Sequence, residues 1–159
     1  MTTAAIEAQS STAMALNIFA SLCGAYAGAA GPYEAEDAVL DHVGLEETNA
    51  GFSGWGYVAA WSANNQSVEF TVVVPAAGDY RADFGYASAA GEAARVLYVN
   101  GAVATARLAF PSTGSWTSWG HAQPTVRLAA GSNTVKLVYE TARSSANPLN
   151  LDALTLSPM

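Results

Sequence analysis

The chain has 159 residues, 13 acidic and 6 basic side chains and a formal net charge of -7, which is the size of one ordinary domain. This balance argues against a surface for nucleic acid or anionic lipid, because Lys and Arg hold those partners. Cys23 is the single cysteine, so an intrachain disulfide is excluded, and no zinc-ligand spacing is present.

Residues 1–31 differ in kind from the rest of the chain, because Glu7 is their single charge. A signal peptide is disfavoured, because no Lys or Arg precedes the apolar run. A membrane span is disfavoured by the polar residues that interrupt that run. We expect an arm that is helical in part or disordered, with a helix at about 4–22 and an apolar stripe of Met14, Ile18 and Leu22. That stripe predicts contact with a second copy, an assembly or a parent enzyme.

From residue 32 onward the hydrophobic period is two, which predicts β-strands. The residues expected to face the core are Val68, Phe70, Val72 and Val74 in one strand, and Tyr80, Ala82, Phe84 and Tyr86 in the next. Further strands are expected at 33–37, 56–61, 95–99, 102–110, 125–130, 133–140 and 150–157. Because no helix separates these roughly nine strands, residues 32–159 are predicted to form an all-β, antiparallel β-sandwich of the jelly-roll type.

Two connections carry turn signals. Asn100-Gly101 predicts a type I′ hairpin, because both central positions of that turn need a positive φ. Gly131-Ser132-Asn133 is expected to join the next pair of strands.

Catalytic motifs are weak in this sequence. The segment 51–55, which reads GFSGW, lacks the final Gly of a nucleophile elbow and precedes a strand rather than a helix. No phosphate-binding loop is present, and no spacing selects a pair of carboxylates for glycoside hydrolysis. We therefore expect a protein that is not an enzyme.

The four tryptophans lie in two connections rich in Gly and Ser, Trp55 and Trp61 in one, Trp116 and Trp119 in the other. Two interpretations stay open at this point. Each indole either closes the end of the core under a long loop, or offers a flat face on which the apolar side of a sugar ring stacks.

Carboxylates stand at both ends of the expected sandwich. Glu34 and Glu36 lie in its first strand and Asp152 in its last. In a strand Glu34 and Glu36 point to the same face, where they repel each other unless a cation lies between them. Calcium, which takes six to eight oxygen ligands, fits such a set. The alternative is a solvated edge of an acidic protein.

Over residues 32–157, the order of YEAED, GFSGWGYV, SVEFTVVVPAAGDYRADFGYA, LYVNG, GSNTVKLVYE and NLDALTL resembles carbohydrate-binding modules of family 35 and of the related family 6. The resemblance implies a β-jelly-roll with a structural calcium held by Glu34, Glu36 and Asp152. It places a sugar site among the loops at one end, with Tyr57, Trp119 or Trp116, and Asn150 as its residues. Some family 35 members bind uronic acids through a second calcium, for which Glu46, Glu47, Asn49 and Asn147 are the candidate ligands here.

These observations lead to two functional hypotheses. The first is a non-catalytic, calcium-stabilised module that binds a polysaccharide, an oligosaccharide or a uronic-acid-containing glycan, as an appendage of a larger secreted enzyme. The second is a structural or adhesive subunit of a virion or cell surface, docked by residues 1–31. Both place the protein outside the cell, and neither includes nucleic acid or a membrane span.

Overall fold

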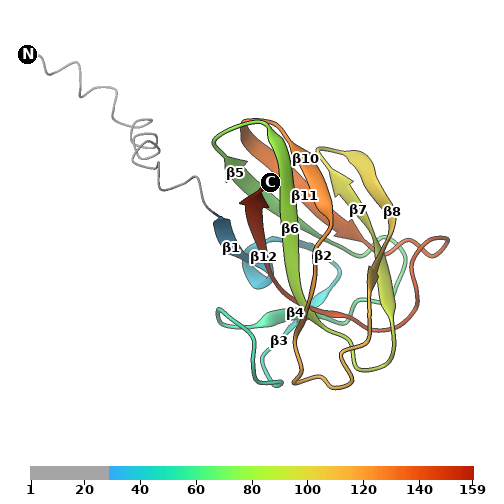
Figure 1. Cartoon of the computed structure of the whole chain (residues 1–159). Coiled ribbons are helices and arrows are strands. Elements are labelled where there is room, and N and C mark those ends of the chain that lie inside the picture. Colours follow the sequence, from blue (N-terminus) through green and yellow to red (C-terminus); the bar gives the residue numbers. More distant parts are fainter. Residues whose placement is uncertain (1–28) are drawn as a thin grey trace, which may run out of the picture.

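The computed structural model describes residues 29–159 as two antiparallel β-sheets that face each other (Figure 1). The seven-stranded sheet contains β1 (Ala30–Glu34), β3 (Gly44–Glu46), β4 (Tyr57–Ala59), β6 (Gly78–Ala87), β9 (Gly120–Ala122), β10 (Thr125–Leu128) and β12 (Asn150–Pro158). The five-stranded sheet contains β2 (Val39–Asp41), β5 (Ser67–Val74), β7 (Ala93–Val99), β8 (Ala102–Phe110) and β11 (Gly131–Val138). The predicted antiparallel sandwich is confirmed.

The core lies between the two sheets and follows the predicted alternation. Every residue expected to face inward from β5 and β6 is buried, with at most 5% of its surface exposed. Phe84 packs between the sheets, with ring centroids 6.4 Å from both Phe70 and Phe110. Burial of one such ring contributes about 1.5–3 kcal/mol, so these three side chains are a large part of what holds the sheets together.

The Asn100-Gly101 turn has the predicted geometry, with φ angles of 50° and 85°, and it joins β7 to β8 in an antiparallel pair. The connection near 131–133 differs from the prediction, because β10 and β11 lie in different sheets. Asn133 stabilises the connection from β10 to β11. Its buried side-chain amide accepts from the Ala129 N–H at 2.9 Å and donates to the Ala129 carbonyl at 2.8 Å.

Three short strands, β2, β3 and β9, were not predicted from the sequence. The strand predicted at 33–37 is wrong at its C-terminal end. β1 stops at Glu34, and the chain continues as the single-turn 3-10 helix η3 (Ala35–Asp37). Glu34 and Glu36 therefore do not share a strand face as predicted. Their carboxylates instead meet at the loop 53–56, to which both are hydrogen-bonded.

The sandwich begins at Ala30, just before the predicted boundary at residue 32. The predicted arm, with its helix at 4–22, its stripe of Met14, Ile18 and Leu22, and Cys23, falls on residues 1–28, outside the described residues. Within residues 29–159, no helix has the length and hydropathy that crossing a membrane requires.

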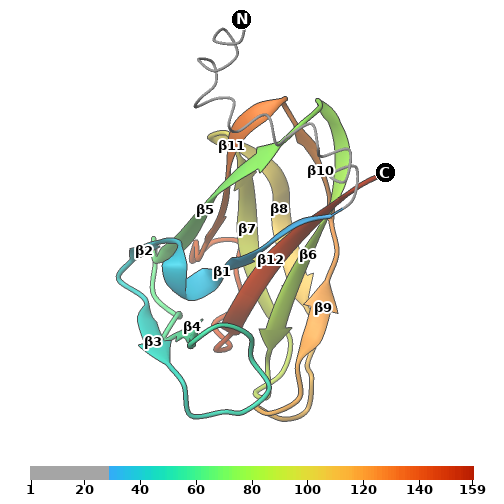
Figure 2. The ribbon, with the colours of Figure 1, turned by 90° about the vertical axis from the view of Figure 1, so that its left-hand side faces the viewer.

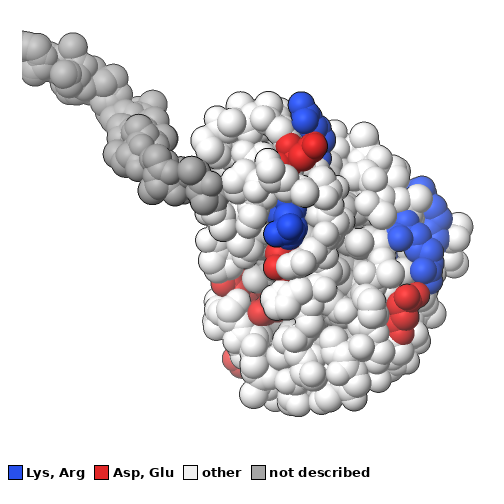
Figure 3. Space-filling view, in the orientation of Figure 1, with Lys and Arg blue, Asp and Glu red and all other residues white. Residues whose placement is uncertain are grey.

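Charged side chains are sparse on the face seen in Figure 3, where basic groups lie beside acidic ones. Two exposed ion pairs are Arg127 with Asp79 and Arg107 with Glu92, each at 3.3 Å. Exposed pairs of this kind contribute about 0–1 kcal/mol each, so the fold depends on its core and not on its surface charges.

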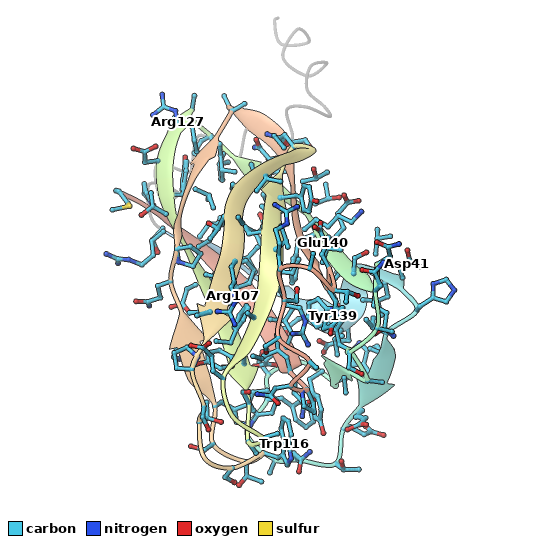
Figure 4. The ribbon with its side chains drawn as sticks, turned by 90° about the vertical axis from the view of Figure 1, so that its right-hand side faces the viewer. Asp41, Arg107, Trp116, Arg127, Tyr139 and Glu140 are labelled. Carbon is cyan, nitrogen blue, oxygen red and sulfur yellow. The ribbon has the colours of Figure 1, made fainter. Side chains whose placement is uncertain are left out.

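Two long connections reach the same end of the sandwich, one between β3 and β4 and one between β8 and β9 (Figure 2). They touch there, because the Trp119 indole N–H donates to the Ala50 carbonyl at 2.9 Å. Trp116, in the second connection, lies at the opposite end of the molecule from Arg127 (Figure 4). Together these loops cover the end at which Asn150 begins β12.

Candidate functional site

Ser53 brings together the first and last strands of the described fold. Its backbone N–H donates to the Asp152 carboxylate at 3.0 and 3.1 Å, and its hydroxyl donates to Glu34 Oε1 at 2.7 Å. The carboxylates of β1 and β12 therefore meet at one loop residue, although 118 positions separate Glu34 from Asp152 in the sequence.

Glu36 approaches the same loop from η3. Its Oε1 accepts the backbone N–H groups of Trp55 and Gly56 at 2.8 and 3.0 Å. Only 5% of Glu36 is exposed, and its Oε2 has no hydrogen-bond partner within residues 29–159. A buried carboxylate oxygen left without a partner costs free energy, so this atom is suited to a ligand that the protein itself does not supply.

Gly54 allows the loop to pass between these acids. Its φ is +64°, and a Cβ built there would lie 2.9 Å from Glu34 Oε1 and closer still to Glu36 Oε1. Because any side chain would collide with both carboxylates, glycine is required at this position.

Asp152 has a strongly perturbed carboxylate. Burial, together with the charges of Glu34 and Glu36, raises the pKa of Asp152 from 3.8 to about 6, although the hydrogen bonds from Ser53 oppose the rise. Within residues 29–159, no three acidic, His or Cys side chains converge closely enough to hold an ion as they stand. The three acids instead surround the Ser53–Gly56 backbone. Their hard oxygens, the repulsion between them and the unpartnered Glu36 Oε2 fit the chemistry of a divalent cation such as calcium.

The metal-free protein is expected to lose stability as the pH rises from about 4 to above about 6. Folded Asp152 holds its proton more tightly than the unfolded chain does, so the free energy of unfolding falls as this proton is removed. Urea unfolding in EDTA across this window measures the effect. Asp152→Asn should lack this part of the decline, and equal slopes in both proteins would contradict the assignment.

An aromatic cluster lies next to the carboxylates, where the two long loops meet. Trp119 packs edge-to-face on Tyr57, with ring centroids 5.3 Å apart, and Phe52 also packs edge-to-face on Tyr57, at 5.4 Å. Trp119 is half-buried. Its indole is therefore fixed in place while part of its face remains open to solvent.

Tyr57 corrects the sequence prediction. It was expected to contact a sugar, but it is completely buried. Its hydroxyl accepts the Asn49 side-chain amide at 2.8 Å and donates to Glu46 Oε1 at 3.3 Å. Because Val58 points into the core, its neighbour Tyr57 points to the opposite face of the sheet, where the loops cover it. Tyr57 packs against Trp119 and has no exposed face on which a sugar could stack.

Asn150 points to the same outer face, because its neighbour Leu151 lies in the core opposite Val58 of β4. Only 6% of Asn150 is exposed, and within residues 29–159 its side-chain amide makes no hydrogen bond. An amide that is nearly buried and free to donate and accept is well suited to the hydroxyl groups of a sugar.

The remaining tryptophans divide between the two interpretations left open by the sequence. Trp61 is a core residue: it is completely buried, and its indole N–H donates to the Gln66 carbonyl at 3.0 Å. Trp116 is half-buried and lies three residues before Trp119 in the same loop, and Trp55 is largely exposed.

The candidate ligands for a second calcium are only partly brought together. Glu46 and Asn49 meet at the Tyr57 hydroxyl. Asn147 makes a different contact, in which its amide donates to the Glu92 carbonyl at 2.8 Å. Glu47 is exposed on the loop after β3.

Sequence reasoning missed Phe52, Ser53 and Gly54 as site residues. Segment 51–55 resembles an incomplete nucleophile elbow, but its Ser53 instead hydrogen-bonds to both Glu34 and Asp152. The pair of glycines around Ser53 was the available signal, because glycines next to a polar residue often mark close approach of the backbone to other groups.

Known proteins match most of this chain. Residues 31–159 match the family model described as "Carbohydrate binding module (family 35)". The chain is 38% identical over 124 residues to a cycloisomaltooligosaccharide glucanotransferase of Niallia circulans. It is 39% identical over 124 residues to an isomaltosyltransferase of Sporosarcina globispora. The structure also resembles a native family 35 carbohydrate-binding module from Clostridium thermocellum, with a TM-score of 0.73 and 29% identity.

The extent of these matches differs between the two kinds of protein. Each enzyme match covers 78% of this chain but only 12% of the glucanotransferase and 11% of the isomaltosyltransferase. The match to the Clostridium thermocellum module covers 81% of this chain and 98% of that one. The similarity is therefore to a module and not to whole enzymes.

Proposed function

Because this chain belongs to carbohydrate-binding module family 35, we propose that it binds a neutral α-1,6-linked glucan without acting on it chemically. The observation that carries this proposal is the partly exposed Trp119 on the same face as the nearly buried Asn150, whose amide is unpaired within residues 29–159. The indole stacks on the apolar face of a glucose ring, and the amide bonds its hydroxyls. Trp116, three residues earlier in the same loop, contacts the next ring.

The charge of the molecule favours a neutral glycan over a uronic acid. The chain carries a net charge of -7. The Glu46 carboxylate lies next to the aromatic cluster, where it accepts a hydrogen bond from the Tyr57 hydroxyl. An acidic sugar would be repelled there unless a second cation were bound. The names of the two enzyme relatives, which refer to isomaltose units, support an α-1,6 linkage.

A calcium ion at Glu34, Glu36 and Asp152 is part of this proposal. It would offset the repulsion among the three carboxylates and give the buried Glu36 Oε2 a partner. Since Ser53 and Gly56 already bond these acids, the ion would stiffen the loop between β3 and β4. The role of the metal is structural.

Calcium is therefore expected to raise the melting temperature of the protein. At a free concentration 100 times its dissociation constant, a ligand of the folded state alone contributes about 2.7 kcal/mol. Thermal unfolding with calcium and with EDTA measures this difference. Asp152→Ala should abolish the response, whereas Asp79→Ala, which removes an exposed acid paired with Arg127, should keep it. A wild-type transition that EDTA leaves unmoved would contradict the site.

We also place the module outside the cell, as part of a larger enzyme that acts on the same glycan. The matches to a small part of two long transferases support this context. In such an enzyme the module holds the catalytic domain near its polysaccharide and raises the effective substrate concentration.

A glycan array probed with the full chain, with and without calcium, tests the ligand. We expect the protein to be retained on dextran and on linear isomaltooligosaccharides. Its retention on polygalacturonate and chitosan should be weak. Retention on polygalacturonate alone, and only with calcium, would replace the neutral glucan by a uronic acid bound through a second metal.

A further inference from the structure

Trp55 differs from the other three tryptophans in its exposure. It is 55% exposed, whereas Trp61 is buried and Trp116 and Trp119 are half-buried. Next to it, Leu45 of β3 is 43% exposed. Since β3 is the last strand on its side of the seven-stranded sheet, both side chains lie at an open edge.

Trp55 is hydrogen-bonded to the 3-10 helix η3 through both its indole and its backbone. Its ring N–H donates to Asp37 Oδ1 at 3.2 Å, and its backbone N–H donates to Glu36 Oε1 at 2.8 Å. A ring fixed before binding loses little conformational entropy when a ligand stacks on it. Neither contact requires the exposed face of the indole.

Two carboxylates lie beside this exposed ring. Trp55 and Leu45 line a shallow hollow of about 80 Å³ together with Glu46 and Glu47. Carboxylates accept strong hydrogen bonds from hydroxyl groups. The hollow therefore combines a flat apolar surface with acceptors at its rim, which is the chemistry of a sugar-binding subsite.

We propose that Trp55 is the stacking platform of a second subsite, which binds another glucose ring of the same polysaccharide; this inference rests on the proposed function. Glu46 connects the two subsites, because it contacts the Tyr57 hydroxyl beneath Trp119 and also lines the Trp55 hollow. A protein partner is disfavoured, because two exposed apolar side chains fall far short of the roughly 800 Å² per partner of a stable interface.

Two linked subsites predict that affinity rises with chain length. A long chain reaches both platforms, whereas a short oligosaccharide occupies only the Trp119 subsite. Trp55→Ala should weaken binding of dextran by about tenfold, which corresponds to roughly 1.4 kcal/mol, and should leave isomaltotriose binding unchanged. Trp55→Phe, which keeps a flat ring, should retain most of the dextran affinity.

Calorimetric titration of the full-length variants with dextran and isomaltotriose provides the test. Equal dextran affinity in wild type and Trp55→Ala would overturn the second subsite while leaving the proposed function intact. If wild type binds neither probe, the proposed function fails and the subsite fails with it.

A second measurement does not depend on a substitution. In protein labelled with 5-fluorotryptophan, the ¹⁹F resonance of Trp55 should shift on adding dextran and stay in place with isomaltotriose. An unmoved Trp55 resonance at saturating dextran would also overturn the subsite.

Discussion

Replacing Arg95 with alanine is expected to lower the free energy of unfolding by about 4 kcal/mol, because its guanidinium makes several hydrogen bonds and two cation–π contacts inside the fold. Arg95 is completely buried, and its guanidinium lies 4.9 Å from the ring centroid of Trp61 and 5.1 Å from that of Tyr139. Burial lowers its pKa to about 10, so it still carries its charge at neutral pH.

The guanidinium bonds only to backbone carbonyls within the described residues. It donates to the carbonyls of Ala94, Ser145, Asn147 and Trp61. The alanine variant would leave these four carbonyls, two of them on the buried residues Ala94 and Trp61, without the guanidinium as a partner. It would also open a cavity between two aromatic rings. Because two of the carbonyls belong to the segment just before Asn150, that segment should loosen as well.

Urea unfolding of Arg95→Ala and of Arg107→Ala measures this effect against a matched control. Arg107 is half-exposed and pairs with Glu92 at 3.3 Å, so its loss should cost no more than about 1 kcal/mol. If both variants unfold at the same urea concentration as wild type, the guanidinium contributes nothing to the fold.

Replacing Trp119 with alanine is expected to weaken glucan binding by about ten- to one-hundredfold, which corresponds to roughly 1.4–2.8 kcal/mol. The substitution removes the stacking surface and leaves Tyr57 and Phe52 in place beneath it. Asn150→Ala should also weaken binding with little change in stability, since its side chain bonds to no other residue within 29–159. Calorimetric titration measures both affinities.

The matched comparison is Phe70→Ala, which empties the core. Phe70 is only 1% exposed, and its truncation should cost about 3–5 kcal/mol of stability. Trp119→Ala should unfold close to the wild-type temperature. If it unfolds as early as Phe70→Ala, Trp119 is a core residue, and the sugar-binding role passes to Trp116.

The sequence predicted the sandwich well where a strand is long enough to show its period. In β5 and β6 the alternate residues are buried as predicted, because a half-buried strand places every second side chain in the core. β2, β3 and β9 were missed, because three residues are too few to display a period of two.

The site depends on tertiary contacts that a linear pattern does not contain. Glu36 is buried in η3 because the N–H groups of the loop 53–56 bond it. Tyr57 is buried because Phe52 and Trp119 reach it from two different loops. The resemblance of the motifs predicted Glu34, Glu36 and Asp152 as calcium ligands and Tyr57, Trp116, Trp119 and Asn150 as sugar-binding residues. Which of these side chains are exposed could be learned only from the fold.

The most direct test of the proposed function is a calorimetric titration of the full chain with isomaltoheptaose in calcium, followed by chromatography of the recovered sugar. We predict saturable binding and an oligosaccharide recovered unchanged, as expected of a module that binds a glucan without cleaving or transferring it. No binding heat at any concentration, or a sugar recovered with altered length, would contradict this account.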